Sequence, residues 1–252
     1  MTPSAGESVK LCFVGNSHLA ALRGGAKKSS IDEIRSADWF AVGGEMLTIQ
    51  NGRLEPPPDG RRPVHTNVAG AAEHGLELAN YSTVVVSAVG LLAIRNASTS
   101  GHPMRRLRLS SWPVGNDLEV ASEAVLVERI WNRIVGGSFA KSVRSLVAIF
   151  PGKVFIYPTP VASETVLGDA EWDLARWYGG GIRQVMSDYW RCQWLAIQRF
   201  VDELGDRAHL VPHPVPGWLD DGFSPTAYSS KDPWHLNKEY GHLALKALAD
   251  LF

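Results

Sequence analysis

The segment from Tyr81 to Val89 constrains the fold more than any other part of the sequence. Its residues, Tyr-Ser-Thr-Val-Val-Val-Ser-Ala-Val, are rich in β-branched side chains, and apolar and polar positions do not alternate. β-Branched residues favour strands, and a strand without alternation is typically covered on both faces. We therefore predict that this segment is a central strand of a parallel sheet.

The remaining segments alternate between short apolar runs and amphipathic stretches. Further strands are predicted at Leu11–Val14, Ala37–Val42, Lys153–Tyr157 and Ala208–Pro212, with a small hairpin at Leu47–Leu54. Helices are predicted at Ser17–Lys28, Ala69–Leu78, Leu118–Ile134, Ile182–Leu204 and Asn237–Leu251. This order predicts a three-layer α/β/α sandwich with a mostly parallel sheet of about five strands. No linker or repeat divides the chain, so residues 1–252 are expected to form a single domain.

Charge and hydropathy exclude several classes of function. The formal net charge is −1, which gives no electrostatic basis for binding nucleic acid or an anionic membrane. Arg105, Arg106 and Arg108 form a local basic cluster that we interpret as a solvated loop. No apolar run approaches the roughly 18 residues that a membrane-spanning helix needs. We therefore expect neither a nucleic-acid partner nor a membrane partner.

The cysteines and the N-terminal residues indicate the compartment. Cys12 and Cys192 are the only cysteines, too few for a disulfide framework or a zinc site. Met1 to Val9 is short and polar, and it lacks the apolar region of a cleaved secretion signal. Both observations favour a cytoplasmic protein.

The turn after the first strand places a serine at a position often used for ligand binding. Lys10 to Leu19 is Lys-Leu-Cys-Phe-Val-Gly-Asn-Ser-His-Leu, a buried strand that ends at Gly15 and leads into a helix. In open parallel sheets, ligands bind beyond the carboxyl ends of the strands. Ser17 is therefore a candidate functional residue, although a serine here can also simply cap the helix. The turn lacks the glycine patterns of dinucleotide and phosphate-binding loops, so no such cofactor is expected.

The segment Asp232-Pro-Trp-His235, just before the last predicted helix, supplies possible partners for Ser17. A serine nucleophile needs a base, and a histidine base is oriented by a carboxylate. Taken alone, Asp232 is also explained as a cap of the last helix, and His235 as an ordinary half-buried histidine. Ser17 comes at the end of the first strand, and the Asp/His pair comes just before the last helix. In a sheet of this topology both positions can lie at one rim, so we predict that Ser17, His235 and Asp232 meet as a catalytic triad.

These two segments resemble the sequence blocks of the SGNH or GDSL-like hydrolases. Phe13-Val-Gly-Asn-Ser-His18 is similar to the family's first block, and Asp232-Pro-Trp-His235 matches its Asp-x-x-His block. The resemblance implies a flavodoxin-like sheet. It also implies that Ser17 is the nucleophile, His235 the general base and Asp232 the carboxylate that orients it.

The resemblance also implies an oxyanion hole with three donors. The first is the backbone N–H of Ser17, and the second is that of Gly44 or Gly43, where a glycine pair follows the second strand. The third is expected to be an asparagine side chain in a Gly-x-Asn block, but here the sequence is Gly90-Leu-Leu92, and Asn96 is the nearest candidate. Loss of one donor costs on the order of 10²–10³ in rate.

Trp234 and His242, which lie in or near the Asp-x-x-His block, are also considered as site residues. Trp234 is expected either to form a wall of an acyl or sugar pocket or to pack in the core. His235 and His242 are seven residues apart and are expected to share a helix face, but the sequence shows no third ligand, so no metal site is predicted.

Three hypotheses for function follow. The first is a serine esterase without cofactors that cleaves a small or carbohydrate-linked acyl ester, for example an acetyl ester. The second is an acyltransferase that uses the same triad with a hydroxyl acceptor in place of water. The third is a non-catalytic binding module that retains the fold, which the altered third block suggests. The sequence contains no signal for the oligomeric state.

Overall fold

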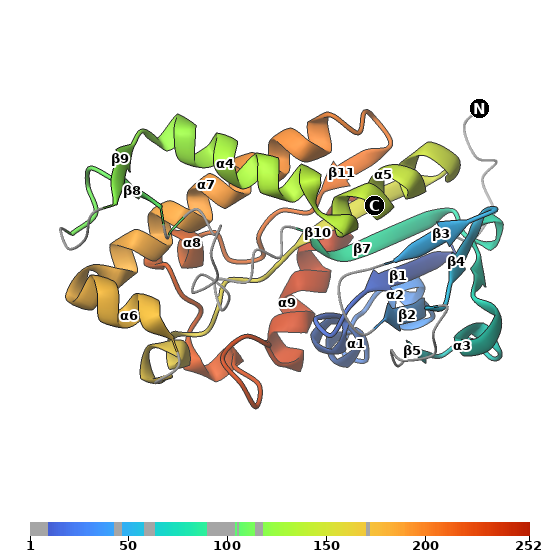
Figure 1. Ribbon diagram of the computed structural model, residues 1–252. Coiled ribbons are helices and arrows are strands. Elements are labelled where there is room, and N and C mark those ends of the chain that lie inside the picture. The colour runs from blue at the N-terminus through green and yellow to red at the C-terminus, as the bar shows by residue number, and fades with distance from the viewer. Residues whose placement is uncertain are drawn as a thin grey trace.

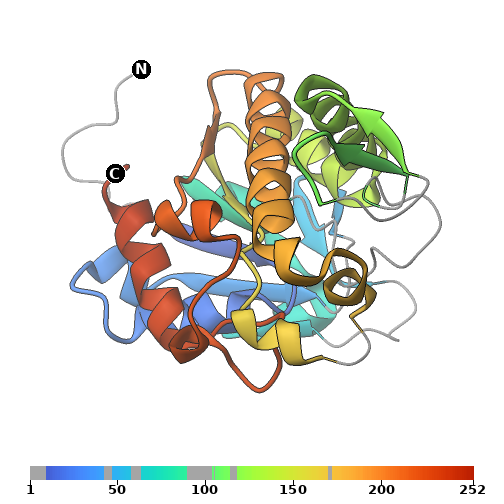
Figure 2. The same cartoon turned by 90° about the vertical axis from the view of Figure 1, so that its left-hand side faces the viewer.

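The computed structural model describes residues 10–42, 47–57, 64–89, 104, 106–113, 118–169 and 172–252. These residues form an α/β protein in which a six-stranded, mostly parallel sheet lies between two groups of helices (Figure 1, Figure 2). From one edge to the other, the strands are β11 (Ala208–Leu210), β10 (Lys153–Pro158), β7 (Thr83–Val89), β1 (Leu11–Gly15), β2 (Asp38–Val42) and β5 (Val64–Thr66). All neighbours are parallel except β2 and β5, which run antiparallel.

The five predicted strands of the sheet are confirmed, and the sixth strand, β5, is an addition that was not predicted. The central position of the Tyr81–Val89 segment is also confirmed, because β7 lies between β1 and β10. Val84 and Val86 pack into the apolar core on one side of the sheet, and Val85 packs into the core on the other. This two-sided burial explains why the segment shows no alternation of apolar and polar residues.

One face of the sheet is covered by the helices from the two ends of the described chain. These helices are α1 (Leu19–Ala26), α2 (Asp32–Arg35), α8 (Gly217–Asp221) and α9 (Lys238–Ala249). Their buried residues Leu22, Ile34, Trp218 and Leu245 close over Phe13 of β1. Figure 2 shows α9 lying beside α1 on this face.

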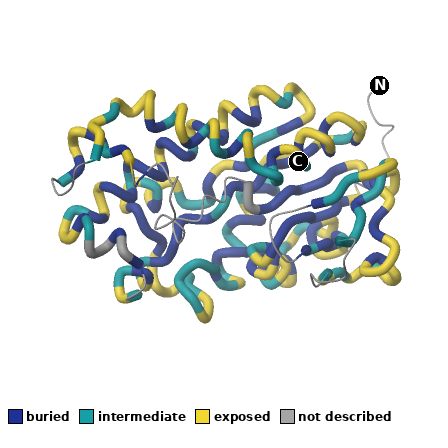
Figure 3. Tube along the Cα trace, viewed as in Figure 1, coloured by how far each residue is buried: buried dark blue, intermediate teal, exposed yellow. Residues whose placement is uncertain are grey.

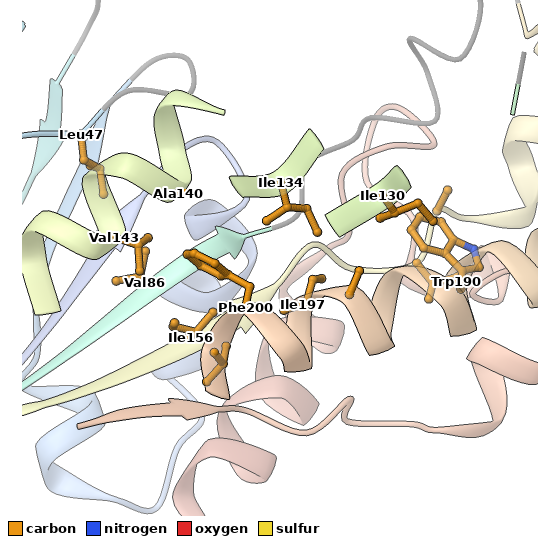
Figure 4. Close-up of a cluster of buried hydrophobic side chains, with 14 of the residues drawn as sticks. Leu47, Val86, Ile130, Ile134, Ala140, Val143, Ile156, Trp190, Ile197 and Phe200 are labelled. Carbon is orange, nitrogen blue, oxygen red and sulfur yellow. The ribbon is translucent and has the colours of Figure 1, made fainter. Parts of the chain in front are cut away.

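The opposite face is covered by helices from the middle of the chain, α4 (Glu123–Gly136), α5 (Ser138–Ile149) and α7 (Ile182–Asp202). Ile134, Val143 and Phe200 come from these three helices and converge on Val86 and Ile156 of the sheet (Figure 4). The central strands of the sheet are almost entirely buried, whereas the outer sides of the helices are exposed (Figure 3). This larger core therefore depends on big apolar side chains from all three helices.

The predicted helix Leu118–Ile134 begins later than expected. The side chain of Ser122 accepts a hydrogen bond from the backbone N–H of Val125 (3.3 Å) and caps α4, so the helix starts at Glu123. The preceding residues form β9 (Glu119–Ala121), which pairs in parallel with β8 (Leu107–Leu109). The next helix, α5, was not predicted at all.

The predicted helix Ala69–Leu78 is wrong over most of its length. Only α3 (Ala71–His74) is helical; Gly75, with a φ of +73°, ends it, and β6 (Leu76–Glu77) follows. β6 pairs with β4 (Arg53–Glu55), which also pairs with β3 (Thr48–Gln50). The predicted hairpin is thus confirmed, and its turn at Asn51 and Gly52 has the positive φ angles that tight hairpins favour.

Short helices complete the described part of the chain: η1 (Leu78–Asn80), η4 (Glu164–Gly168), α6 (Asp173–Tyr178), η5 (Gly179–Gly181) and η6 (Thr226–Tyr228). The stretch rich in tryptophan and glycine around α6 contributes to the core, because Trp172 is buried and packs edge to face against Phe223 with ring centroids 6.0 Å apart.

Two glycines allow α1 and α9 to lie in close contact. A Cβ atom added at Gly241 would overlap the carbonyl oxygen of Ala21, and one added at Gly25 would overlap the backbone of Gly241. The glycines at the end of α1 do not terminate the helix, which continues to Ala26. This close approach places the loop that precedes α9 against the start of α1, and the candidate site lies there.

Candidate active site

Ser17 follows the carboxyl end of β1, in the turn that leads into α1. The residues of β1 and the next residue, Asn16, are buried, whereas Ser17 is exposed. A Cβ atom at Gly15 would lie 2.9 Å from the carbonyl oxygen of Ser87 in β7, so the chain can turn this closely to the sheet only with glycine there. The turn therefore displays the serine hydroxyl at the rim of the sheet.

The serine hydroxyl is not used to cap the helix. The side chain of Asn16 accepts the backbone N–H of His18 (3.1 Å), and His18, which occupies the N-cap position of α1, makes no side-chain capping hydrogen bond. Ser17 Oγ instead lies 2.8 Å from Nε2 of His235, although the two residues are 218 positions apart. The interpretation of Ser17 as a helix cap is therefore wrong.

His235 and Asp232 form the second half of the arrangement. Nδ1 of His235 lies 2.9 Å from Oδ1 and 2.8 Å from Oδ2 of Asp232. The imidazole thus contacts the serine through one nitrogen and the carboxylate through the other, the geometry by which a carboxylate fixes the tautomer of a histidine base. The three predicted residues do meet in space.

The backbone holds this carboxylate in place. Oδ1 of Asp232 accepts the N–H groups of Trp234 (2.9 Å) and His235 (3.0 Å), which closes a tight turn around it. The α9 helix is capped by Asn237, whose side chain accepts from Glu239 (3.0 Å), so Asp232 is not the cap that its position also allowed. The N–H of Ser163 binds the carbonyl of Pro233 (3.0 Å) and secures the turn to a neighbouring loop.

The electrostatics favour an ionised Asp232. Partial burial opposes ionisation, but hydrogen bonds from the His235 ring and from the backbone N–H of Trp234 outweigh it and hold the pKa of the carboxyl below its ordinary value. A charged Asp232 stabilises the imidazolium that forms when His235 takes a proton.

His18 is a site residue that the sequence analysis missed. Its ring lies beside that of His235, with centroids 4.9 Å apart and planes 30° apart. Burial, and next the proximity of His235, lower the pKa of His18 to about 4, so it is neutral at pH 7. An uncharged ring there supports His235 without repelling the imidazolium. Its position next to Ser17 was the one available signal.

A cleft of about 470 Å³ opens beside Ser17, a size suited to a small-molecule ligand. It runs between α1 and the edge of the sheet formed by β2 and β5, with Ala20, Arg23 and Lys27 on one side and Trp39 and His65 on the other. A second hollow of about 480 Å³, over β10 and β11, is lined by Lys153 and His209 among others and contains none of the triad residues.

The other predicted site residues are placed differently. Trp234 is half-buried and packs edge to face against Trp172, with ring centroids 6.1 Å apart, and it is not among the residues that line the cleft. The second and third oxyanion donors, Gly44 (or Gly43) and Asn96, lie outside the described residues, as does Gly90-Leu-Leu92.

The expectation that His235 and His242 share a helix face is wrong. The α9 helix begins at Lys238, because Asn237 caps it, and His235 belongs to the preceding turn. Within the ranges that the structure covers, no group of three histidine, cysteine, aspartate or glutamate side chains is arranged to hold a metal ion. No helix in the described part of the chain is long and apolar enough to cross a membrane.

Comparisons of this chain with protein-family models, with curated proteins and with solved structures found no match. The functional argument therefore depends on the geometry of the site.

Proposed function

We propose that this protein is a serine esterase that cleaves a small or carbohydrate-linked acyl ester, such as an acetyl ester, with Ser17, His235 and Asp232 as its triad. The observation that carries the proposal is the continuous hydrogen-bonded chain from Ser17 Oγ to His235 Nε2 (2.8 Å) and from His235 Nδ1 to Asp232 Oδ2 (2.8 Å). Ser17 is also exposed beside a cleft, so an ester can reach it.

Sequence and topology support a relationship to the SGNH or GDSL-like hydrolases. The Gly-Asn-Ser-His and Asp-x-x-His segments that resemble the family's blocks supply the triad residues. In addition, the five parallel strands occur in the order β2, β1, β7, β10 and β11, which corresponds to the 2-1-3-4-5 order of flavodoxin-like sheets.

The proposed reaction has two steps. In the first, Ser17 Oγ attacks the ester carbonyl while His235 Nε2 takes its proton; the tetrahedral intermediate then collapses, and His235 gives this proton to the departing alcohol. In the second, His235 takes a proton from water, the hydroxide attacks the acyl-serine, and the carboxylic acid leaves as Ser17 regains its proton. The proposed donors to the oxyanion are the N–H groups of Ser17 and Gly44 and the side chain of Asn96.

A reducing, cytoplasmic location is part of the proposal. Both cysteines are free and buried, and burial raises the pKa of the Cys192 thiol to about 12, so neither is poised for redox chemistry.

The decisive experiment is hydrolysis of a 4-nitrophenyl acetate series by the protein and by its Ser17→Ala and His235→Ala variants. Intact-mass measurement after fluorophosphonate treatment accompanies it. We expect turnover and a single adduct in the parent protein, and loss of both in Ser17→Ala, with far-UV circular dichroism unchanged.

A folded protein that neither turns over esters nor forms the adduct contradicts the proposal and favours a binding module. Acyl transfer to an added sugar in preference to water identifies an acyltransferase.

A further inference from the structure

The cleft beside Ser17 carries an unusual distribution of charge. One of its walls is the side of α1 that continues from the serine: Ala20 follows Ser17 by three positions, Arg23 by six and Lys27 by ten. Ala20 and Arg23 are three residues apart within α1, and Lys27 lies four residues beyond Arg23, directly after the helix; residues at these spacings are neighbours on one side of a helix. Arg23 and Lys27 therefore lie on the side of α1 that carries Ala20 and borders the cleft.

The other wall comes from the edge of the sheet. Trp39 and Ala41 are two residues apart on β2 and so point to the same face, and His65 of β5 lies directly opposite Ala41 in the antiparallel pair. Trp39 is stacked on Phe13, with ring centroids 4.1 Å apart and planes 7° apart. One wall of the cleft thus contains the aromatic ring of Trp39, held in place by Phe13, and the other contains the basic side chains of Arg23 and Lys27.

The basic side chains in this cleft lack acidic partners. No aspartate or glutamate is among the described residues that line it, and neither Arg23 nor Lys27 makes an ion pair or side-chain hydrogen bond within the described part of the chain. Two other cations in this part of the chain do have acidic partners: Lys28 pairs with Glu239 (2.7 Å), and Arg35 pairs with Asp32. The two cations of the cleft are therefore available to a ligand.

The helix geometry gives the distance of these cations from the start of α1, and Ser17 stands in the turn just before it. At a rise of 1.5 Å per residue, Arg23 lies about 6 Å and Lys27 about 12 Å along the axis from Leu19, the first residue of the helix. The Cα–Cβ bonds of helical residues incline toward the N-terminus, so the side chain of Arg23 leaves the helix toward the end of α1 at which Ser17 stands. An anionic group several bonds from the scissile carbonyl fits this spacing.

We propose that the substrate is an anionic ester whose carboxylate or phosphate group is held in this cleft by Arg23 and Lys27, while its apolar part lies against Trp39. This inference rests on the proposed esterase function and adds the class of substrate. Arginine binds carboxylate and phosphate groups in a bidentate manner, and lysine binds them as a point charge. An uncharged sugar ester can accept hydrogen bonds from these two cations but lacks the charge attraction that an anion gains.

Two pairs of isosteric esters test the proposal. Mono-4-nitrophenyl glutarate and its carboxamide analogue differ only in charge on the acyl side. 4-Acetoxybenzoate and 4-acetoxybenzamide differ only in charge on the alcohol side. In at least one pair, we expect kcat/KM of the carboxylate ester to exceed that of the amide by about fivefold or more, the size expected for exposed ion pairs.

Variants connect this preference to the cleft. The ratio within the preferred pair should fall by about twofold in Arg23→Gln and approach one in the double variant with Lys27→Gln. It should also fall in 0.5 M NaCl, because exposed charges are screened. Arg129→Gln is the matched control: Arg129 is exposed on α4, across the sheet, and should leave the ratio unchanged. Ratios near one in both pairs, or a ratio that survives the double variant, overturn the proposal.

A binding measurement separates this proposal from the esterase proposal. Calorimetry with phenyl phosphate on the Ser17→Ala variant needs no catalysis, and binding is expected to be lost when Arg23→Gln and Lys27→Gln are added. If esters are not cleaved but this binding is found, the anion site stands and the esterase proposal fails. If esters are cleaved without charge preference and phenyl phosphate does not bind, the esterase proposal stands and the anion site fails.

Discussion

The helices on the two faces of the sheet pack together in different ways. Over the face that carries α4, α5 and α7, large apolar side chains such as Phe200 and Ile134 fill the space between the helices and the strands. Over the other face, which also has an apolar core, α1 and α9 approach each other through Gly25 and Gly241, where no side chain fits. Ser17 and His235 lie at the end of this second contact. Substitutions in the first core should therefore affect stability alone, whereas substitutions at the glycine contact should affect both stability and the site.

The side chains of Asp188 and Asp232 differ in a similar way, since one is buried in the structure and the other is exposed at the candidate site. The side chain of Asp188 on α7 is 4% exposed, accepts the indole N–H of Trp112 (3.1 Å) and pairs with Arg191 (3.1 Å). The side chain of Asp232 is 45% exposed and contacts the His235 imidazole. The first connects α7 to the segment around Trp112, and the second is available for chemistry.

The largest expected effect is that of Asp232→Asn on activity. Asparagine can keep the backbone hydrogen bonds of the turn but no longer holds His235 in the required tautomer, so kcat should fall by about 10⁴ with little change in stability. Ester hydrolysis and urea denaturation measure the two effects.

Asp188→Asn is the matched control, and it should reduce stability rather than activity. It weakens a buried charged contact and should lower the free energy of unfolding by about 1–3 kcal/mol while the folded protein keeps its kcat. Loss of kcat in folded Asp188→Asn would break the distinction between the two carboxylates.

Next in size is Phe200→Ala on the α4, α5 and α7 face. Phe200 is fully buried, so the substitution should cost about 3–5 kcal/mol of unfolding free energy through lost burial and a cavity. Denaturation with urea measures the cost, and kcat of the remaining folded protein should be retained. Val125→Ala, at a position 44% exposed on α4, should stay within about 0.5 kcal/mol of the parent.

Gly241→Ala should affect both stability and activity, because it acts on the face that carries the site. The added methyl group overlaps the backbone of α1 at Ala21, and the overpacking should cost about 1–3 kcal/mol and displace His235 from Ser17. Gly136→Ala is the control: nothing lies within 4 Å of its Cβ position at the end of α4, so alanine should be neutral or stabilising there. Equal behaviour of the two variants contradicts the close-contact argument.

The last expected effect concerns pH. The pKa of His18 is lowered to about 4 in the folded protein from an ordinary value of 6.5, mainly by burial, and that of His213 is also lowered to about 4. Between pH 6.5 and pH 4 the unfolded chain therefore binds protons that the folded protein does not, and stability should fall as the pH falls through this window.

Replacement of His18 by glutamine should make this pH dependence shallower in denaturation experiments. His74→Gln, at an exposed position on α3, should leave it unchanged. A parent protein whose stability is constant from pH 6.5 to pH 4 is inconsistent with a neutral, buried His18.

The parts of the fold that were predictable are those with a local signal. The strands at Leu11–Val14 and Tyr81–Val89 are apolar runs buried on both faces, and the Gly-Asn-Ser turn follows directly from the first. β5, β6 and β9 have two or three residues each, and only pairing with distant partners makes them strands. The α5 helix, although not predicted, does carry a local signal, since Ala140, Val143 and Val147 follow helical spacing.

The same holds for the candidate site, where only the residues with a local sequence signal were predictable. Ser17, Asp232 and His235 stand in two short motifs, and residue type and spacing identify them. His18 and the cleft cations Arg23 and Lys27 could not be assigned, because their surroundings come from β2, β5 and the loop before α9. Such environments depend on tertiary contacts that no local pattern encodes.

The 218 positions between Ser17 and His235 also affect how the protein is made. At about 5–20 residues per second, a ribosome adds the proposed base roughly 10–40 s after the proposed nucleophile. During that interval the nascent chain holds a serine without its histidine. The proposed esterase activity should therefore report that translation has passed His235 and that α9 has docked on α1, and a nascent chain stalled earlier should be silent in the same assay.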